Sequence, residues 1–191
     1  MKSRLFLLSF LLLLVSCGKA PVFSGEILNE TFVSPEGLKV QLNDLKGSVG
    51  TVVVFFSPEC PLCINYTKTI KDLDSLFARS GISFILVYPG KYYSATQISA
   101  FSRTYALHEH DVLDPELKIA EKFKATVTPE AILFDREGNI VYSGAIDDWS
   151  YETGRKKRTA ANKYLFEGIT ALLESRKPAI AYVEPAGCYI E

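Results

Sequence analysis

The sequence predicts an α/β protein in which helices flank a mixed β-sheet. Two apolar runs, 51–56 and 82–87, have the length and composition of buried strands, and a segment with helical spacing of its apolar residues joins them. A strand, a crossover helix and a second strand form a parallel pair. Later, 131–134 and 139–142 flank Asp-Arg-Glu-Gly, a turn sequence that predicts an antiparallel hairpin. Parallel units followed by a hairpin and a last helix indicate a mixed sheet covered by helices.

The first segment has the pattern of a bacterial export signal. Two basic residues precede an apolar stretch, 5–15, that is too short to span a bilayer as a mature helix. The tetrapeptide Leu-Val-Ser-Cys at 14–17 resembles the bacterial lipobox, in which the cysteine is lipid-modified and becomes the first residue after cleavage. The alternative is an ordinary signal cleaved nearby, which leaves Cys17 as a free thiol. We expect residues 1–17 to be a lipoprotein signal peptide with a lipidated Cys17 that anchors the protein to a membrane.

A tether and a hairpin are expected before the first buried strand, and a helix is expected after it. Residues 18–28 are expected to form a tether, and 31–33 with 38–42 enclose Pro-Glu-Gly, which predicts an N-terminal β-hairpin. After the first buried strand, apolar residues recur at helical spacing over 64–77, and Gly81 ends this pattern.

In the second half of the chain, helical patterns again alternate with short apolar segments. Helical patterning returns at 96–106 and again at 115–123, with the short apolar segment 111–114 between them. After the hairpin, 160–175 is expected to form the closing helix, and 176–191 is a C-terminal tail.

Length and charge limit the range of partners. About 175 residues remain after removal of the signal, which is one domain of ordinary size with enough chain for a substantial core. The net charge is −1 and acidic and basic residues nearly balance. This balance argues against nucleic acid as a partner.

Two cysteines three residues apart follow the first buried strand directly, in Ser-Pro-Glu-Cys-Pro-Leu-Cys at 57–63. Pro61 suits the first position of a helix, which places Cys60 at the helix N-terminus and Cys63 one turn further on. The partial positive charge and free N–H groups of a helix N-terminus stabilise a thiolate. A zinc half-site would need a second paired motif, and a structural disulfide across so short a loop would stabilise little. The motif therefore predicts a redox-active dithiol.

The order of these features resembles the thioredoxin fold: strand, Cys-x-x-Cys, helix, strand, helix, and then Thr128-Pro129 before a hairpin. Over roughly 29–175 the chain is similar to the extracytoplasmic redoxins, the TlpA-like and AhpC/TSA-like thiol-disulfide branch. That branch carries strings similar to Val-Thr-Pro-Glu at 127–130 and Gly-Ala-Ile-Asp-Asp at 144–148. The resemblance implies that Pro129 is cis and faces the dithiol, so that the backbone of Thr128 pairs with an incoming extended chain.

The resemblance also implies a thiol-disulfide oxidoreductase. In such an enzyme Cys60 would form a mixed disulfide with a partner, and Cys63 would resolve it by closing the intramolecular bridge. The redox-active Cys60–Cys63 disulfide would need no other cofactor and no metal. The expected partners are cysteine-containing exported proteins and an upstream thiol-disulfide partner. The expected location is the bacterial cell envelope, with the domain facing the periplasm.

Two positions depart from the redoxin pattern. Thioredoxins keep a buried acid six residues before the nucleophile, where this chain has Val54. Some membrane-anchored reductases use a glutamate six residues after it, where this chain has Tyr66. Glu59 and Glu130 are the remaining acids near the expected site. We interpret both as solvated surface residues and candidate accessory groups.

Two alternative functions follow from the same fold. A peroxiredoxin-like thiol peroxidase requires a proline seven residues and a threonine or serine three residues before its reactive cysteine. Ser57 meets the second requirement, whereas Val53 does not meet the first. A copper-delivery protein would bind Cu(I) through soft thiolates and a histidine, which leaves His108 and His110 as candidate ligands.

A further cysteine, Cys188, lies in the C-terminal tail. Similar Gly-Cys-x-Ile endings occur in some bacterial redoxin-domain proteins. Three roles stay open: a second resolving thiol for Cys60, a docking thiol, or a packed residue, since a buried free cysteine behaves as a small hydrophobic side chain. Burial of Tyr182 and Tyr189 is expected to hold the tail on the domain.

Overall fold

A computed structural model describes residues 25–107, 109–152, 155–157 and 159–191. The predicted export signal with Cys17 and most of the tether lie outside the described residues. The helices are α1 (Glu26–Asn29), α2 (Pro61–Phe77), α3 (Ala95–Tyr105), α4 (Lys118–Phe123) and α5 (Tyr164–Leu173), with 3-10 turns η1 (Leu42–Leu45) and η2 (Ala78–Ser80). The strands are β1 (Thr31–Val33), β2 (Lys39–Gln41), β3 (Gly50–Phe55), β4 (Ile82–Pro89), β5 (His110–Asp114), β6 (Val127–Thr128), β7 (Glu130–Asp135), β8 (Ile140–Gly144), β9 (Ser150–Glu152), β10 (Arg155–Lys156), β11 (Tyr182–Val183) and β12 (Cys188–Tyr189).

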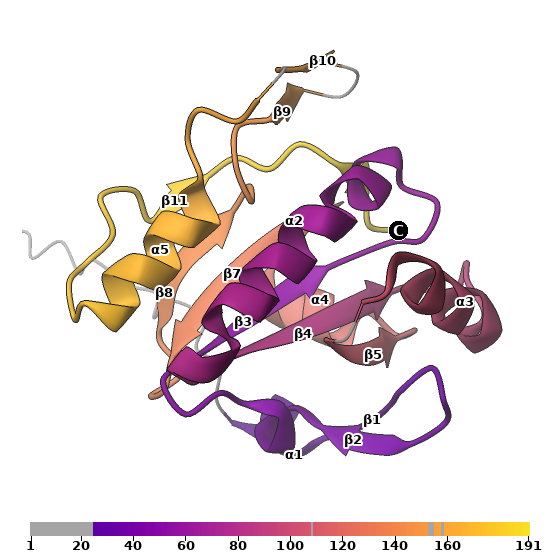
Figure 1. Cartoon of the computed structure of the whole chain (residues 1–191). Coiled ribbons are helices and arrows are strands. Elements are labelled where there is room, and N and C mark those ends of the chain that lie inside the picture. Colours follow the sequence, from indigo (N-terminus) through magenta and orange to yellow (C-terminus); the bar gives the residue numbers. More distant parts are fainter. Residues whose placement is uncertain (1–24, 108, 153–154, 158) are drawn as a thin grey trace, which may run out of the picture.

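The central sheet is mixed, as the sequence predicts (Figure 1). Its eight strands are ordered β11-β8-β7-β3-β4-β5-β1-β2. β3, β4 and β5 run parallel, whereas β7 is antiparallel to β3 and β8 is antiparallel to β7. The N-terminal hairpin is confirmed, because β1 and β2 pair antiparallel and extend the sheet beyond β5.

Both faces of the sheet are covered, which makes the central strands apolar throughout. Every residue of β3 is buried, and its side chains alternate between two apolar clusters. Val52 and Val54 belong to the cluster that includes α2, α3 and α5, whereas Val53 and Phe55 belong to the cluster that includes α1 and α4. The dithiol at the start of α2 is therefore attached to the most deeply buried strand.

Three segments differ from the sequence prediction. The closing helix expected over 160–175 is shorter and spans Tyr164–Leu173. The helix expected over 115–123 begins only at Lys118, because the Asp114 carboxylate accepts hydrogen bonds from the backbone N–H groups of Ile119 and Ala120 at 3.0 and 2.9 Å. The tether expected over 18–28 overlaps α1. Its residues Ile27 and Leu28 are buried in the cluster beneath α4, and they belong to the domain rather than to a linker.

The C-terminal tail, yellow in Figure 1, passes the edge of the sheet at β11 and then runs across the molecule toward the start of α2, where β12 pairs with β6. β11 pairs in parallel with β8, and Val183 aligns with Gly144. Gly144 has φ +114°, and a Cβ atom there would lie 1.8 Å from the Val183 carbonyl oxygen, so only glycine permits this close approach. The expected burial of Tyr182 and Tyr189 is wrong, since these side chains are 55% and 81% exposed. Backbone pairing holds the tail instead.

Among the described residues, no helix has the length and apolar character needed to cross a membrane.

Candidate active site

The dithiol lies at the junction of β3 and α2. Cys60 is the residue that precedes the helix, and Pro61 occupies its first position, as expected. Cys60 is 3% exposed, whereas Cys63 is completely buried one turn further on. Both are free thiols. This arrangement leaves Cys60 nearer to the surface and places Cys63 behind it.

The segment before Pro129 faces the dithiol. The Thr128–Pro129 peptide bond is cis, as the resemblance implies. The Cys60 thiol donates a hydrogen bond to the Thr128 carbonyl oxygen at 3.1 Å. On the other side, the backbone N–H of Ser57 donates to the Cys63 sulfur at 3.4 Å. The structure thus brings together all four residues expected to carry the chemistry.

The two thiols have opposite acidities. A hydrogen bond from the Cys63 thiol lowers the pKa of Cys60 to about 5 in spite of burial, with further donation from the Cys188 thiol and from the backbone N–H groups of Cys63 and Leu62. Burial raises the pKa of Cys63, and its hydrogen bond to Cys60 and the Cys60 charge raise it further. At neutral pH the pair therefore holds a protonated Cys63 and a Cys60 thiolate, which no longer donates to the Thr128 oxygen and accepts from Cys63 instead.

No carboxylate occupies either of the usual proton-transfer positions. Val54 is completely buried and packs in the same apolar cluster as Cys63. The Tyr66 hydroxyl donates to the Asp147 carboxylate at 2.6 Å, and burial raises the pKa of Tyr66. The Tyr66 ring also packs edge-on against Trp149, with centroids 5.6 Å apart. Tyr66 is therefore a buried hydrogen-bond donor, and its partner Asp147 was not identified from the sequence.

The two candidate accessory acids lie in different environments. Glu59 is exposed at the groove beside Cys60, as expected. The expectation that Glu130 is solvated is wrong, because this side chain is only 5% exposed. Its carboxylate accepts hydrogen bonds from the backbone N–H groups of Thr126 and Val127 at 2.9 and 3.5 Å, and burial raises its pKa. Glu130 therefore orients the backbone segment that faces the dithiol.

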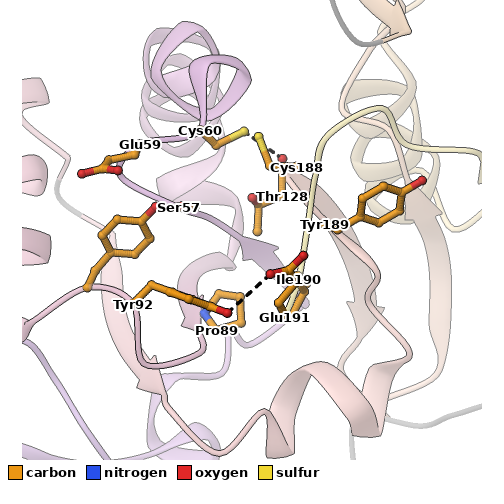
Figure 2. Close-up of a pocket in the computed structure, with 11 residues that line it drawn as sticks. Ser57, Glu59, Cys60, Pro89, Tyr92, Thr128, Cys188, Tyr189, Ile190 and Glu191 are labelled. Carbon is orange, nitrogen blue, oxygen red and sulfur yellow. Dashed lines mark hydrogen bonds between the residues drawn. The ribbon is translucent and has the colours of Figure 1, made fainter.

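A groove of about 450 Å³ opens over Cys60, and the C-terminal tail forms one of its walls (Figure 2). Cys188 is the strand partner of Thr128, and Figure 2 shows its sulfur next to that of Cys60. The Cys188 side chain is exposed, so the interpretation of Cys188 as a packed core residue is wrong. Partial desolvation of the sulfur beside Cys60 raises its pKa to about 12, although the residue as a whole is exposed, and its interaction with Cys60 adds to the rise.

The residues considered for other chemistry do not join this groove. His110 is exposed and begins β5, whereas His108 lies outside the described residues. No cluster of three or more histidine, cysteine or acidic side chains that could hold a metal ion occurs in the described parts of the chain. Val53, where the peroxidase motif has proline, is a fully buried residue of β3 that pairs with strands on both sides.

The fold and the dithiol opposite a cis-proline define a thioredoxin-like redoxin. The chain belongs to the AhpC/TSA family, whose model matches residues 18–143. It is 25% identical over 153 residues to the thiol-disulfide oxidoreductase ResA of Bacillus subtilis (strain 168), an alignment that covers 73% of this chain and 84% of that protein. The protein is accordingly an oxidoreductase of the redoxin class.

Solved structures share the fold at low sequence identity. An uncharacterized conserved protein from Geobacillus kaustophilus superposes with a TM-score of 0.75 at 22% identity, covering 91% of this chain and 90% of that one. A secreted Mycobacterium tuberculosis disulfide oxidoreductase homologous to E. coli DsbE gives a TM-score of 0.57 at 15% identity, covering 80% and 99% of the two chains. The tail with Cys188 lies beyond the residues that the family model matches.

Proposed function

We propose that Cys60 and Cys63 are the redox centre and that the protein exchanges disulfides with cysteine-containing exported proteins. One observation carries the proposal: a thiol of lowered pKa at a helix start lies 3.1 Å from the carbonyl oxygen of Thr128, before a cis-proline. A substrate chain extended beside Thr128 would bring its own cysteine to Cys60.

The reaction proceeds through a mixed disulfide. The Cys60 thiolate attacks one sulfur of the substrate disulfide, an S–S bond forms between them, and the other substrate sulfur leaves as a thiolate. Cys63 then loses its proton and attacks the Cys60 sulfur, which closes the Cys60–Cys63 disulfide and releases the second substrate thiolate. The substrate gains two electrons and the dithiol loses them. The same steps in reverse oxidise a substrate dithiol.

The acidity of Cys63 changes during this cycle. The Cys60 charge is one cause of the raised Cys63 pKa in the reduced protein. In the mixed disulfide Cys60 carries no charge, so this contribution disappears and Cys63 becomes easier to deprotonate. Cys63 thus stays protonated while Cys60 attacks and becomes a better nucleophile when resolution is needed. The exposed Glu59 lines the groove next to Cys60, and we assign proton exchange with the groove to this carboxylate.

The proposed location is the bacterial cell envelope, with the domain held by a lipid on Cys17 and facing the periplasm. The export pattern of residues 1–17 supports this location, and the M. tuberculosis protein of the same fold is described as secreted. An upstream thiol-disulfide partner would restore the dithiol after each turnover. Replacement of Cys17 by alanine should move the protein from the membrane fraction to the soluble fraction. A mature N-terminal peptide without acyl chains would contradict the anchor.

Turnover of a disulfide-bonded protein substrate tests the redox assignment. With a chemical reductant present, the wild-type chain should accelerate substrate reduction, and Cys60→Ser should fall to the rate without protein. Leu76→Ala is the matched control. The Leu76 side chain on α2 is 59% exposed, and this variant should keep wild-type activity. Equal activity of Cys60→Ser and wild type would refute the assignment. Hydrogen peroxide consumption that exceeds disulfide turnover would favour a peroxidase instead.

A further inference from the structure

The C-terminal tail occupies the open edge of β6. Cys188 pairs with Thr128 and Tyr189 with Val127 in an antiparallel two-stranded sheet. The backbone N–H of Ile190 donates to the Thr126 carbonyl oxygen at 3.0 Å and continues the pairing. Under the proposed function, a substrate chain would use this same edge.

Contacts on both sides of Cys188 fix the tail in this position. A Cβ atom on Gly187 would lie 2.4 Å from the Thr128 carbonyl oxygen, so the residue before Cys188 must be glycine for the strand to approach so closely. After Cys188, Ile190 packs against the apolar cluster that contains α4, and the Tyr92 hydroxyl donates to the Glu191 carboxylate at 3.4 Å. The tail is docked by its backbone and by neighbouring side chains, independently of the cysteine itself.

The docked tail presents a thiol to the nucleophile. Figure 2 shows the sulfur atoms of Cys188 and Cys60 next to one another at the groove, above Thr128. The Cys188 thiol helps to lower the pKa of Cys60, and the Cys60 thiol lies 3.1 Å from the Thr128 carbonyl oxygen. A cysteine on a strand paired with Thr128 is the geometry that a mixed disulfide with a substrate requires.

We propose that the tail is a tethered substrate strand and that Cys188 is a third redox-active cysteine, which forms a disulfide with Cys60. This inference rests on the proposed function of the Cys60–Cys63 dithiol. It adds an internal partner that competes with protein substrates for Cys60 and for the edge of β6.

The exchange is balanced without an external oxidant. Starting from the Cys60–Cys63 disulfide that substrate turnover produces, the Cys188 thiol loses its proton and attacks the Cys60 sulfur. The Cys60–Cys188 bond forms, the Cys60–Cys63 bond breaks, and Cys63 leaves as a thiolate that takes up a proton. One disulfide and one thiol are present before and after the step. Attack by Cys63 on Cys60 reverses it.

Disulfide mapping on the full chain tests this inference. Wild type and Cys63→Ser are equilibrated with excess glutathione disulfide over glutathione, quenched with acid, alkylated, digested and analysed by mass spectrometry. Wild type should contain both Cys60–Cys63 and Cys60–Cys188 disulfides. Cys63→Ser should contain mainly the intramolecular Cys60–Cys188 disulfide, because the docked tail gives Cys188 a high effective concentration relative to glutathione.

A glycine variant separates the docked geometry from simple proximity along the chain. In the Cys63→Ser background, Gly187→Ala should shift the ratio of the Cys60–Cys188 disulfide to the glutathione mixed disulfides by at least about tenfold toward glutathione. Ile180→Ala, an exposed change upstream in the same tail, should leave that ratio unchanged. An unchanged ratio in Gly187→Ala would overturn the docked-strand geometry.

The outcomes distinguish this inference from the proposed function. Separate glutathione adducts on Cys60 and Cys188, together with normal Cys60–Cys63 turnover in wild type, would overturn the role of Cys188 alone. A wild-type chain that forms no disulfide at Cys60 and turns over no substrate would overturn the proposed function and this inference together. The wild-type mapping needs no substitution, so it decides the question even where a variant folds poorly.

Discussion

Cys188 is the antiparallel strand partner of Thr128. The carbonyl oxygen of the same Thr128 accepts the hydrogen bond of the Cys60 thiol. One backbone position therefore aligns the nucleophile and a cysteine from the far end of the chain. This relationship explains why the tail forms a wall of the groove over Cys60, and it gives the site three thiols within one small region.

The lowered pKa of Cys60 predicts the pH dependence of its alkylation. In the reduced protein, the rate of carboxamidomethylation at Cys60, followed by peptide mass spectrometry, should be half-maximal near pH 5 and constant through neutral pH. Cys188→Ala removes one hydrogen-bond donor to the thiolate and should move the midpoint upward. A midpoint near the ordinary thiol pKa of about 8.5 would contradict this account of the site.

The same shift links pH to the stability of the reduced protein. The folded-state pKa of Cys60 lies below its unfolded value, so the thiolate contributes stability that is present above the unfolded pKa and is lost as the pH falls through about 5. Urea unfolding of the reduced wild type should therefore show a gain between pH 5 and 8.5 that is missing in Cys60→Ser. Parallel pH profiles of the two proteins would count against a lowered pKa.

Glu130 should position the segment before Pro129 through its two backbone contacts. Glu130→Ala leaves the N–H groups of Thr126 and the buried Val127 without this acceptor, which should cost about 1–3 kcal/mol of unfolding free energy and lower kcat/KM for disulfide exchange. Glu130→Gln keeps one acceptor oxygen and should recover part of both losses. Thermal unfolding and exchange kinetics measure these effects. Equal unfolding free energies and equal kcat/KM values for Glu130→Ala, Glu130→Gln and wild type would show that the two backbone contacts of Glu130 are unimportant.

Tyr66 should stabilise the fold through Asp147. Tyr66→Phe removes the donor at 2.6 Å from a buried carboxylate and should cost about 1–3 kcal/mol, with the Cys60 alkylation midpoint unchanged. Tyr189→Phe, at an 81% exposed position, is the matched control and should leave the unfolding free energy unchanged. A shift of the Cys60 midpoint in Tyr66→Phe would instead place Tyr66 in the proton chemistry of the dithiol.

Gly144 should fix the start of the tail along the sheet. Gly144→Ala combines a φ of +114° with a Cβ contact of 1.8 Å to Val183, whereas Gly37→Ala has a φ of +84° and open space around the new atom. Gly37→Ala should cost about 1–2 kcal/mol from backbone strain alone. Gly144→Ala should cost more and should increase hydrogen exchange in the tail. Equal losses of unfolding free energy in the two variants would show that moving β11 away from Gly144 costs no stability.

Local signals predicted the parts of the fold that are long or strongly patterned. The apolar runs of β3 and β4 and the helical spacing of α2 each carry enough residues for their periodicity to be read directly. Pro61 marked the start of α2, which placed the dithiol correctly. The cis bond at Pro129 came from the resemblance to redoxins, because an isolated Thr-Pro sequence favours trans.

The remaining features depend on contacts between distant residues. β11 and β12 are two residues long and have no pattern of their own, so their pairing follows only from the folded sheet. Glu130 begins β7 and has the charge of a surface residue, yet it is buried, and its carboxylate accepts from the backbone N–H groups of Thr126 and Val127. Cys188 is evident in the sequence as an extra thiol, but its position beside Cys60 follows only from the pairing of β12 with β6.

A redox titration with disulfide mapping shows which cysteines of the site exchange electrons. The reduced wild-type chain is equilibrated across a series of glutathione ratios, and the partner of each cysteine is identified by mass spectrometry at every potential. We expect Cys60 to be present in every intramolecular disulfide that forms, and Cys60–Cys63 to appear as a two-electron transition. A Cys60 that stays fully alkylatable while Cys63 or Cys188 becomes oxidised would contradict this expectation.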